Sequence, residues 1–291
     1  FGLLGPNGAG KTTSVKVLTT LIKPTEGRAF VDGIDVVANP RAVRTRIGLT
    51  GQYAAVEERL TGRENLELIG RYFHQRRSEQ KARATQLLEM FDLVDAADRV
   101  AKTYSGGMRR RLDIAMSLVA RPSVLFLDEP TTGLDPRSRF GMWDFIAKLG
   151  DEGTTVLLTT QYLEEADRLA EKIAVIDTGR KIAEGTADEL KDQIGGDKVR
   201  VSIVKPENIE RAKEAVASLC VGAVIEDPET PLTLLAPIRA GGGVVPQMIR
   251  ALDGAGVDVT DVEVRRPTLD DVFLVLTGHA AEVAEVEEDK A

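Results

Sequence analysis

Short aliphatic runs alternate with stretches of helical periodicity over the first two thirds of the chain. The runs are rich in Val, Leu, Ile and Thr and are bounded by Gly, Pro or polar residues, which is typical of strands. They lie at 1–4, 28–36, 47–52, 123–130, 154–160 and 172–186. Because such strands separated by helices favour a parallel sheet, residues 1–192 predict one largely parallel α/β domain.

The period changes to that of helices between about 53 and 120, which predicts a helical subdomain inserted into the sheet domain. Two apolar stripes carry this pattern, and both are expected to be core without chemistry of their own. Their members are Leu66, Ile69, Tyr72 and Phe73 in the first, and Leu87, Leu88, Phe91 and Leu93 in the second.

A second unit is predicted at 198–278, as a small α/β (α+β) accessory domain with an antiparallel component. Its expected strands are 198–204, 223–227, 232–238 and 257–264, and its expected helices are 209–219, 244–252 and 269–276. The acidic tail at 279–291 is expected to be solvated and disordered.

Composition narrows the class of protein. The chain has 291 residues, of which 43% are hydrophobic, and this is enough for one large domain and a smaller one. A net charge of -8 disfavours a general nucleic-acid binder, so no nucleic-acid partner is expected. The apolar runs fall far short of the roughly 18–20 residues that a membrane-spanning helix needs, so any membrane role requires another chain.

Two further features concern the single cysteine and the first residue. Because Cys220 is the single cysteine of this sequence, it has no partner for an intrachain disulfide, which fits a reducing cytosol. Its expected role is that of a small buried side chain at a helix end.

Phe1 already lies in the strand that leads into a glycine-rich loop, and the sequence has no initiator Met. Because that strand is expected to be central, the natural protein is expected to extend upstream.

The glycine-rich loop at 5–13, GPNGAGKTT, matches the phosphate-loop pattern between a strand and a helix. Its backbone N–H groups and a lysine would surround phosphate oxygens, and a threonine hydroxyl would ligate Mg²⁺. The residues expected to bind nucleotide are Gly5, Pro6, Asn7, Gly8, Ala9, Gly10, Lys11, Thr12 and Thr13, with Thr12 as the metal ligand. The alternative is a turn without a ligand, and the motif alone does not separate kinases, GTPases, helicases and transport ATPases.

A second triphosphate element is SVLFLDEP at 123–130, a strand that delivers two carboxylates to its carboxyl end. Asp128 is suited to hold Mg²⁺ through water, and Glu129 points elsewhere and is suited to polarise an attacking water. The alternative is a solvated acidic turn.

A third element, Ser105, Gly106 and Gly107, precedes a long helix and offers a second phosphate-binding site. Since one nucleotide does not need two such phosphate-binding sites, this one is expected to contact a nucleotide that is bound to another subunit.

The order of these motifs along the chain is similar to that of the ATP-binding-cassette family, and the resemblance covers nearly all of residues 1–192. The resemblance implies a P-loop NTPase core, ATP and Mg²⁺ as cofactors, and a head-to-tail homodimer. It implies that Ser105 and Gly107 touch the γ-phosphate across the dimer interface and that Asp135, in GLDP, couples the two sites. Gln52, in LTGQY, would link Mg²⁺ to the membrane subunits. Lys11, Glu129 and Gln161 would carry catalysis.

The chain departs from the family pattern at three places. Tyr104 and Met108 replace the ends of the usual Leu-Ser-Gly-Gly-Gln signature, while the phosphate-facing positions are kept. Gln161 stands where the family has its switch histidine, and a glutamine can donate a hydrogen bond but cannot become cationic, so slower hydrolysis is expected. The alternative is that Gln161 is a passive surface residue. The aromatic residue that stacks on adenine normally precedes the phosphate loop, in a region outside this sequence.

A narrower resemblance is to the daunorubicin-resistance branch of drug and lipid exporters. It is carried by Gln161, YSGGMRRRLDIA at 104–115, DEPTTGLDPRSR at 128–139 and RRPTLDDVF at 265–273. It implies an ATPase at the cytoplasmic face of the cell membrane that powers export of hydrophobic drugs, polyketides or lipids through a separately encoded membrane-spanning permease. Two rival hypotheses are a cassette ATPase acting on nucleic acid or ribosomes, and an ATP-dependent drug-sequestering protein. A GTPase is disfavoured because the chain has no Asn-Lys-x-Asp motif.

Overall fold

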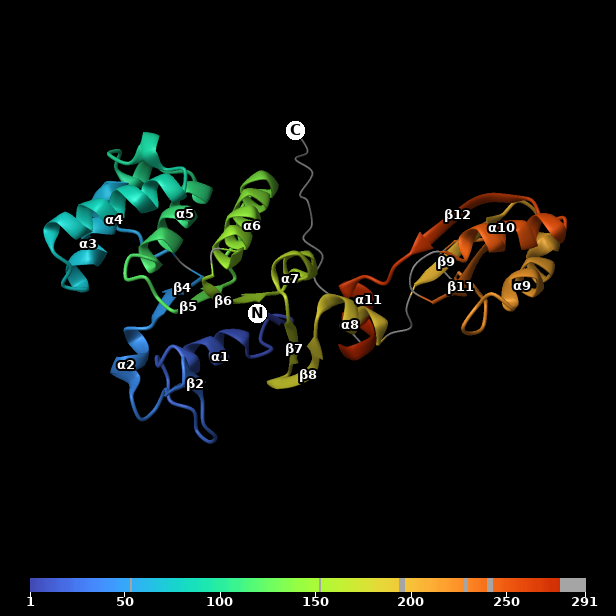
Figure 1. The fold of residues 1–291 in the computed structure, drawn as a ribbon, viewed down its shortest axis with the longest axis horizontal. Coiled ribbons are helices and arrows are strands. Elements are labelled where there is room, and N and C mark those ends of the chain that lie inside the picture. Colours follow the sequence, from blue (N-terminus) through green and yellow to red (C-terminus); the bar gives the residue numbers. More distant parts are fainter. Residues whose placement is uncertain (53, 152, 194–196, 228–229, 240–242, 278–291) are drawn as a thin grey trace. The chain divides into compact units, whose positions relative to one another are not determined.

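The computed structural model describes residues 1–52, 54–151, 153–193, 197–227, 230–239 and 243–277, and Figure 1 shows its helices and strands. These residues form two compact units that divide between Glu184 and Gly185. The division comes earlier in the chain than the boundary at 192 that the sequence suggested. Helix α8 (Ala187–Asp192) accordingly belongs to the second unit, where it packs on α11 (Leu269–Thr277). The acidic tail lies outside the described residues.

The first unit is built on a six-stranded sheet of order β4-β5-β6-β1-β7-β8. Its strands are β1 (Gly2–Leu4), β4 (Ile47–Thr50), β5 (Val124–Asp128), β6 (Thr155–Thr160), β7 (Ile173–Asp177) and β8 (Arg180–Gly185). The pairs from β4 to β7 are all parallel, which confirms the predicted parallel α/β fold. Strand β1 lies between β6 and β7, with Leu4 opposite Thr160 on one side and Val175 on the other. The loop that follows β1 therefore starts at the middle of the carboxyl edge of the sheet.

The prediction that residues 28–36 join the parallel sheet is wrong. Strands β2 (Phe30–Val31) and β3 (Ile34–Asp35) form a separate antiparallel pair. Asp32 and Gly33 between them have φ values of 51° and 73°. Two consecutive residues with positive φ make a tight hairpin turn, and Asp-Gly is a preferred sequence for it, so the chain reverses here instead of crossing over.

Helices flank the sheet and form the inserted subdomain. They are α1 (Lys11–Leu18), α2 (Pro40–Arg44), α6 (Pro136–Asp151) and α7 (Leu163–Leu169), and in the insertion α3 (Gly62–Tyr72), α4 (Arg77–Met90) and α5 (Gly106–Ser117), with short 3₁₀ turns at Val94–Ala96 and Ala101–Thr103. The stripe at 87–93 is buried as predicted, and so is Leu66. Tyr72 and Phe73 are not core, because 70% and 44% of their surfaces are exposed. They lie where α3 ends, with Phe73 as its C-cap.

The second unit contains a four-stranded antiparallel sheet of order β10-β11-β9-β12. Its elements are β9 (Lys198–Ile203), a 3₁₀ turn at Pro206–Asn208, α9 (Ile209–Ala217), β10 (Ile225–Glu226), β11 (Thr233–Pro237), α10 (Val245–Gly254) and β12 (Val259–Arg265). Alternate residues of β9 are buried, so one face of the sheet packs against α9 and α10. Among the described residues no helix is both long and apolar enough to cross a membrane.

Candidate active site

The loop at 5–13 packs closely against the sheet at Gly5, whereas space is free beside the backbone at Gly8. A Cβ added to Gly5 would lie 2.1 Å from the carbonyl oxygen of Ile176 in β7, so only glycine fits there. Gly8 and Gly10 have φ values of 80° and 105°, which glycine adopts without strain. No atom lies within 4 Å of the Cβ position at Gly8, so this side of the loop can be approached by a ligand. Gly10 is the N-cap of α1.

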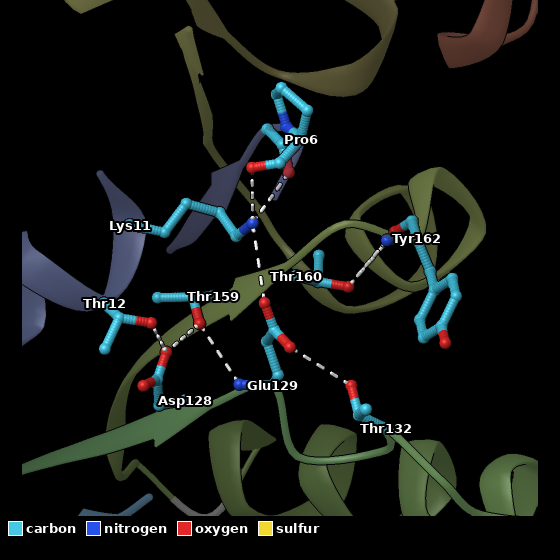
Figure 2. Close-up of polar contacts among 10 residues, drawn as sticks. Pro6, Lys11, Thr12, Asp128, Glu129, Thr132, Thr159, Thr160 and Tyr162 are labelled. Atoms are coloured by element: carbon cyan, nitrogen blue, oxygen red, sulfur yellow. Dashed lines mark hydrogen bonds and ion pairs between the residues drawn. The ribbon is translucent and has the colours of Figure 1, made fainter. Parts of the chain in front are cut away.

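Lys11 curls back over this loop and is only 4% exposed. Its Nζ donates hydrogen bonds to the carbonyl oxygens of Gly5 at 2.8 Å and Pro6 at 3.0 Å. The same Nζ lies 3.5 Å from Oε1 of Glu129, as Figure 2 shows. The cation is thus held at the N-terminus of α1, where the helix dipole also favours an anion.

Asp128 ends β5 and is directed toward the start of α1. Its Oδ1 accepts hydrogen bonds from Thr12 Oγ1 at 3.2 Å and from Thr159 Oγ1 at 2.6 Å (Figure 2). Thr12 and Asp128 are the two predicted metal ligands that the structure brings together, and hydroxyl and carboxylate oxygens suit Mg²⁺. The described residues contain no cluster of three or more His, Cys, Asp and Glu side chains that would form a metal site alone.

Glu129 points away from Asp128, as the sequence predicted, and its carboxylate lies toward Lys11 (Figure 2). Its φ of 50° lies in the left-handed region, which is unfavourable for a residue with a side chain. Its backbone N–H donates to both the carbonyl oxygen and Oγ1 of Thr159, each at 3.1 Å. Its Oε2 accepts from Thr132 Oγ1 at 3.4 Å. The carboxylate is therefore held beside the phosphate loop by a constrained backbone.

Gln161 directly follows β6, and its Oε1 is buried without a hydrogen-bond partner in the described structure. The buried carboxyl of Glu165 lies on the helix that follows. It accepts hydrogen bonds from Thr131 Oγ1 at 2.8 Å and Trp143 Nε1 at 2.9 Å. Burial raises the pKa of Glu165, while its hydrogen bonds from Thr131 and Trp143 act in the opposite direction. The network ties the segment after Gln161 to the segment after Glu129.

Ser105 is the N-cap of α5, and its Oγ accepts a hydrogen bond from the N–H of Met108 at 3.2 Å. Ser105 and Gly106 are exposed, whereas Gly107 is buried. A Cβ at Gly107 would lie 2.8 Å from Oγ of Ser138 in α6. An exposed helix N-terminus with a hydroxyl therefore exists where the sequence predicted one.

The last two predicted residues, Asp135 and Gln52, are exposed. Asp135 precedes α6, and its Oδ1 accepts from the N–H of Ser138 at 3.0 Å. Hydrogen bonds from Ser138 lower the pKa of Asp135. Gln52 follows the end of β4, and the structure gives its side chain no bond to Thr12 or Asp128.

Three residues of the site were missed by the sequence reasoning: Thr159, Thr132 and Arg110. The signal for Thr159 was a polar pair, Thr159 and Thr160, at the carboxyl end of the predicted strand 154–160. The signal for Arg110 was an arginine and an aspartate three residues apart, Arg110 and Asp113, in a helix whose other buried positions are apolar or glycine.

Comparison with known proteins gives two family matches, "ABC transporter" over residues 1–132 and "ATP-binding protein DrrA1-3-like, C-terminal domain" over residues 185–277. The daunorubicin resistance ATP-binding protein DrrA2 of Streptomyces coeruleorubidus is 55% identical over 99% of this chain and 89% of its own length. The daunorubicin/doxorubicin resistance ATP-binding protein DrrA of Streptomyces peucetius is 49% identical, over 99% and 87%.

A solved dimeric structure of an ATP-binding cassette in a post-hydrolysis state, bound to ADP and Pi, is similar in fold. Its TM-score is 0.56 at 28% identity, over 64% of this chain and 84% of that one. The matched regions contain the loop that holds Lys11 and the turn that holds Glu129. The chain therefore belongs to the ATP-binding-cassette family of ATPases, in the branch of the daunorubicin-resistance ATP-binding proteins.

Proposed function

We propose that this chain is the ATP-hydrolysing subunit of an exporter of hydrophobic drugs, polyketides or lipids, at the cytoplasmic face of the cell membrane. The observation that carries the proposal is the pairing of Lys11 with Glu129 beside the Thr12–Asp128 contact. A phosphate-binding cation, a carboxylate able to accept a proton and a pair of oxygen ligands then lie around one loop. The names of the relatives support drug export as the use of this ATPase.

Different backbone and side-chain groups of this chain would carry out the separate tasks of ATP hydrolysis. Backbone N–H groups of the loop and the Lys11 ammonium stabilise the charge on the transferred phosphoryl group. Glu129 orients the attacking water and accepts its proton. Thr12 and Asp128 would hold Mg²⁺, which when bound neutralises charge on the phosphate oxygens. The Gln161 amide would donate a hydrogen bond to the terminal phosphate.

The second half of each site would come from another copy of the chain. Ser105 is exposed at the N-terminus of α5, which favours an anion, and Gly107 is buried in the first turn of that helix. Asp135 is exposed directly before α6. The dimeric cassette structure with ADP and Pi supports this assembly by likeness of fold. The partner in the membrane would be a separately encoded permease, contacted through the region of Gln52.

The first test separates binding from hydrolysis. Glu129→Gln removes the proton acceptor but keeps the size of the side chain, so ATP binding is expected to stay within about threefold of wild type. Turnover is expected to fall at least about 100-fold, the size of a general-base contribution. Glu89→Gln, the same change at an exposed position of α4, serves as the control. Wild-type turnover in Glu129→Gln would refute the role of Glu129.

The second test concerns the exporter. The full-length protein is expressed with the membrane protein encoded beside its gene, and ATPase activity and drug efflux are measured in membrane vesicles. Copurification and stimulation of the ATPase by the membrane protein are expected. Activity that ignores the membrane protein but responds to ribosomes or nucleic acid would favour the rival cassette ATPase, and drug binding without efflux would favour sequestration.

A further inference from the structure

Arg110 lies in the first turns of α5, and all three nitrogens of its guanidinium group donate hydrogen bonds inside the protein. It is 7% exposed. Its Nε donates to the carbonyl oxygen of Pro130 at 2.8 Å. Its Nη1 donates to the carbonyl oxygen of Gly51 at 2.6 Å and to Oδ2 of Asp113 at 3.3 Å. Its Nη2 donates to the carbonyl oxygens of Asp128 at 3.3 Å and Glu129 at 3.2 Å. A guanidinium has five N–H groups, so every one of them has a partner here. Lysine, with three donors and no planar fork, cannot reproduce this set.

Three of these acceptors belong to the acidic turn, which we define as residues 128–130. Arg110 donates hydrogen bonds to the carbonyl oxygens of all three residues. Glu129 has a left-handed backbone, and such a conformation persists only where its surroundings enforce it. Hydrogen bonds to a charged donor are stronger than neutral ones, so Arg110 is a main restraint on the direction of the Glu129 side chain.

The same group also holds the glutamine segment, which we define as the described residues Gly51, Gln52, Ala54 and Ala55. Gly51 is bound directly through its carbonyl oxygen. Ala55 is bound through Asp113, whose Oδ1 accepts from the Ala55 N–H at 2.8 Å while its Oδ2 pairs with Arg110. Gln52 is therefore anchored on both sides by one buried ion pair, while its own side chain is exposed.

We propose that Arg110 and Asp113 form a positioning pair that transmits displacement of the glutamine segment to the direction of the Glu129 carboxylate. The pair touches backbone on both sides and no reacting atom, so it acts through Glu129. A shift of Gly51 or Ala55 changes the position of the guanidinium, and the guanidinium sets the carbonyls of the acidic turn. The inference rests on the proposed role of Glu129 in hydrolysis.

The test measures hydrolysis and transmission separately in the full-length protein. Cys220 is the only cysteine among these 291 residues, so a Cys220→Ser, Ala54→Cys protein, with any cysteine outside these residues also replaced by Ser, carries one environment-sensitive fluorophore at the exposed position 54 of the glutamine segment. The measurements are the Kd for MgATP, the fluorescence change on MgATP binding, and single-turnover hydrolysis with protein in excess. Arg110→Lys is compared with Arg109→Lys, a control on the same helix whose arginine pairs with Glu58 at the surface.

Arg110→Lys is expected to keep the MgATP Kd within about threefold and to lose at least about tenfold in hydrolysis rate, together with most of the fluorescence change. Asp113→Asn is expected to reduce the fluorescence change with a smaller loss of rate, because Asn can still accept from Ala55. Arg109→Lys is expected to match wild type in all three measurements. If Arg110→Lys unfolds, Arg110→Gln takes its place.

Two outcomes would overturn the inference. One is an Arg110→Lys protein that hydrolyses ATP and reports binding at Ala54 as wild type does. The other is a loss of MgATP binding that accounts for the whole loss of rate, which a purely structural role would produce. Glu129→Gln is measured in parallel: if it hydrolyses normally the proposed function fails, and if it is inactive while Arg110→Lys is normal only this inference fails.

Discussion

At the scale of single residues, the site depends on charges that are buried next to one another. Asp113 is the clearest example, since burial raises its pKa from the ordinary 3.8 to about 6 even though it pairs with Arg110. Desolvation outweighs the hydrogen bond from Ala55 and the attraction of the arginine. Removing a charged carboxylate from water costs free energy that an imperfect pair does not fully return.

The raised pKa predicts a pH dependence of stability. The unfolded chain loses the Asp113 proton near 3.8 and the folded chain near 6, so between these values the folded state binds more protons. The contribution of Asp113 to the free energy of unfolding therefore falls as pH rises from about 4 to 6, by up to about 3 kcal/mol. Urea unfolding of wild type and Asp113→Asn over this range measures the difference. A difference that does not change with pH would contradict the prediction.

Gln161 gives a second prediction at this scale. A glutamine amide stays neutral, whereas a histidine at the same position titrates near its ordinary pKa of about 6.5. Gln161→His is expected to raise the hydrolysis rate several-fold relative to wild type as pH falls through that value, because a cation binds the terminal phosphate more strongly. The ratio of kcat/KM values for the two proteins is measured from pH 5.5 to 8. A constant ratio would place Gln161 outside the reaction.

At the scale of elements, the turn between β1 and α1 combines two glycines with different requirements. Gly5→Ala places a methyl group 2.1 Å from a backbone oxygen of β7, which cannot move without the sheet, so a loss of about 3 kcal/mol or more is expected. Gly8→Ala has open space and suffers only the cost of positive φ, about 1 kcal/mol. Thermal unfolding of both variants tests this order. A reversed order would mean that the loop does not press against β7.

Much of this element scale was predictable from the sequence, because aliphatic strands, glycine-rich loops and helical periodicity are local signals. The parallel strands and the elements from 198 onward in the second unit were recovered in this way, and so was the loop that carries Lys11. The hairpin at 30–35 was misassigned because its Asp-Gly turn was read as part of one strand. Tyr72 was misassigned because a stripe does not show where its helix leaves the core.

The site was predictable only where a residue acts through a motif. Thr12, Asp128 and Glu129 belong to short patterns whose chemistry fixes their neighbours in space. Thr159 and Arg110 act through contacts between segments far apart in the chain, 31 residues for Thr159 and Asp128 and 59 for Arg110 and Gly51. Such contacts depend on strand order and on the seating of α5, which no local pattern encodes.

At the scale of the whole molecule, the hydrophobic clusters of the two units are separate among the described residues. The described residues of the cluster formed by α9, α10 and the antiparallel sheet all lie in the second unit, and Leu234 among them is fully buried. Leu234→Ala is expected to destabilise this unit by about 2–5 kcal/mol and to leave the MgATP Kd unchanged. Leu87→Ala, in the core of the first unit, is the matched control.

Nucleotide distinguishes the two units in calorimetry. MgATP at about 100 times its Kd is expected to stabilise the first unit by about 2.7 kcal/mol and to leave the second transition in place. In Leu234→Ala only the transition that does not respond to MgATP should move, and in Leu87→Ala only the responsive one. A single transition that moves in both variants would mean that the units unfold together.

The central position of β1 has a consequence for how the protein is made. Among the described residues, β1 pairs only with β6 and β7, whose paired positions lie more than 150 residues later in the chain, with Gly2 opposite Leu158 and Ile173. A nascent chain that has not yet delivered those strands has no sheet into which this strand can insert. Retention of ATP by ribosome-bound chains should therefore appear abruptly, once synthesis has passed β7, and not grow in proportion to length.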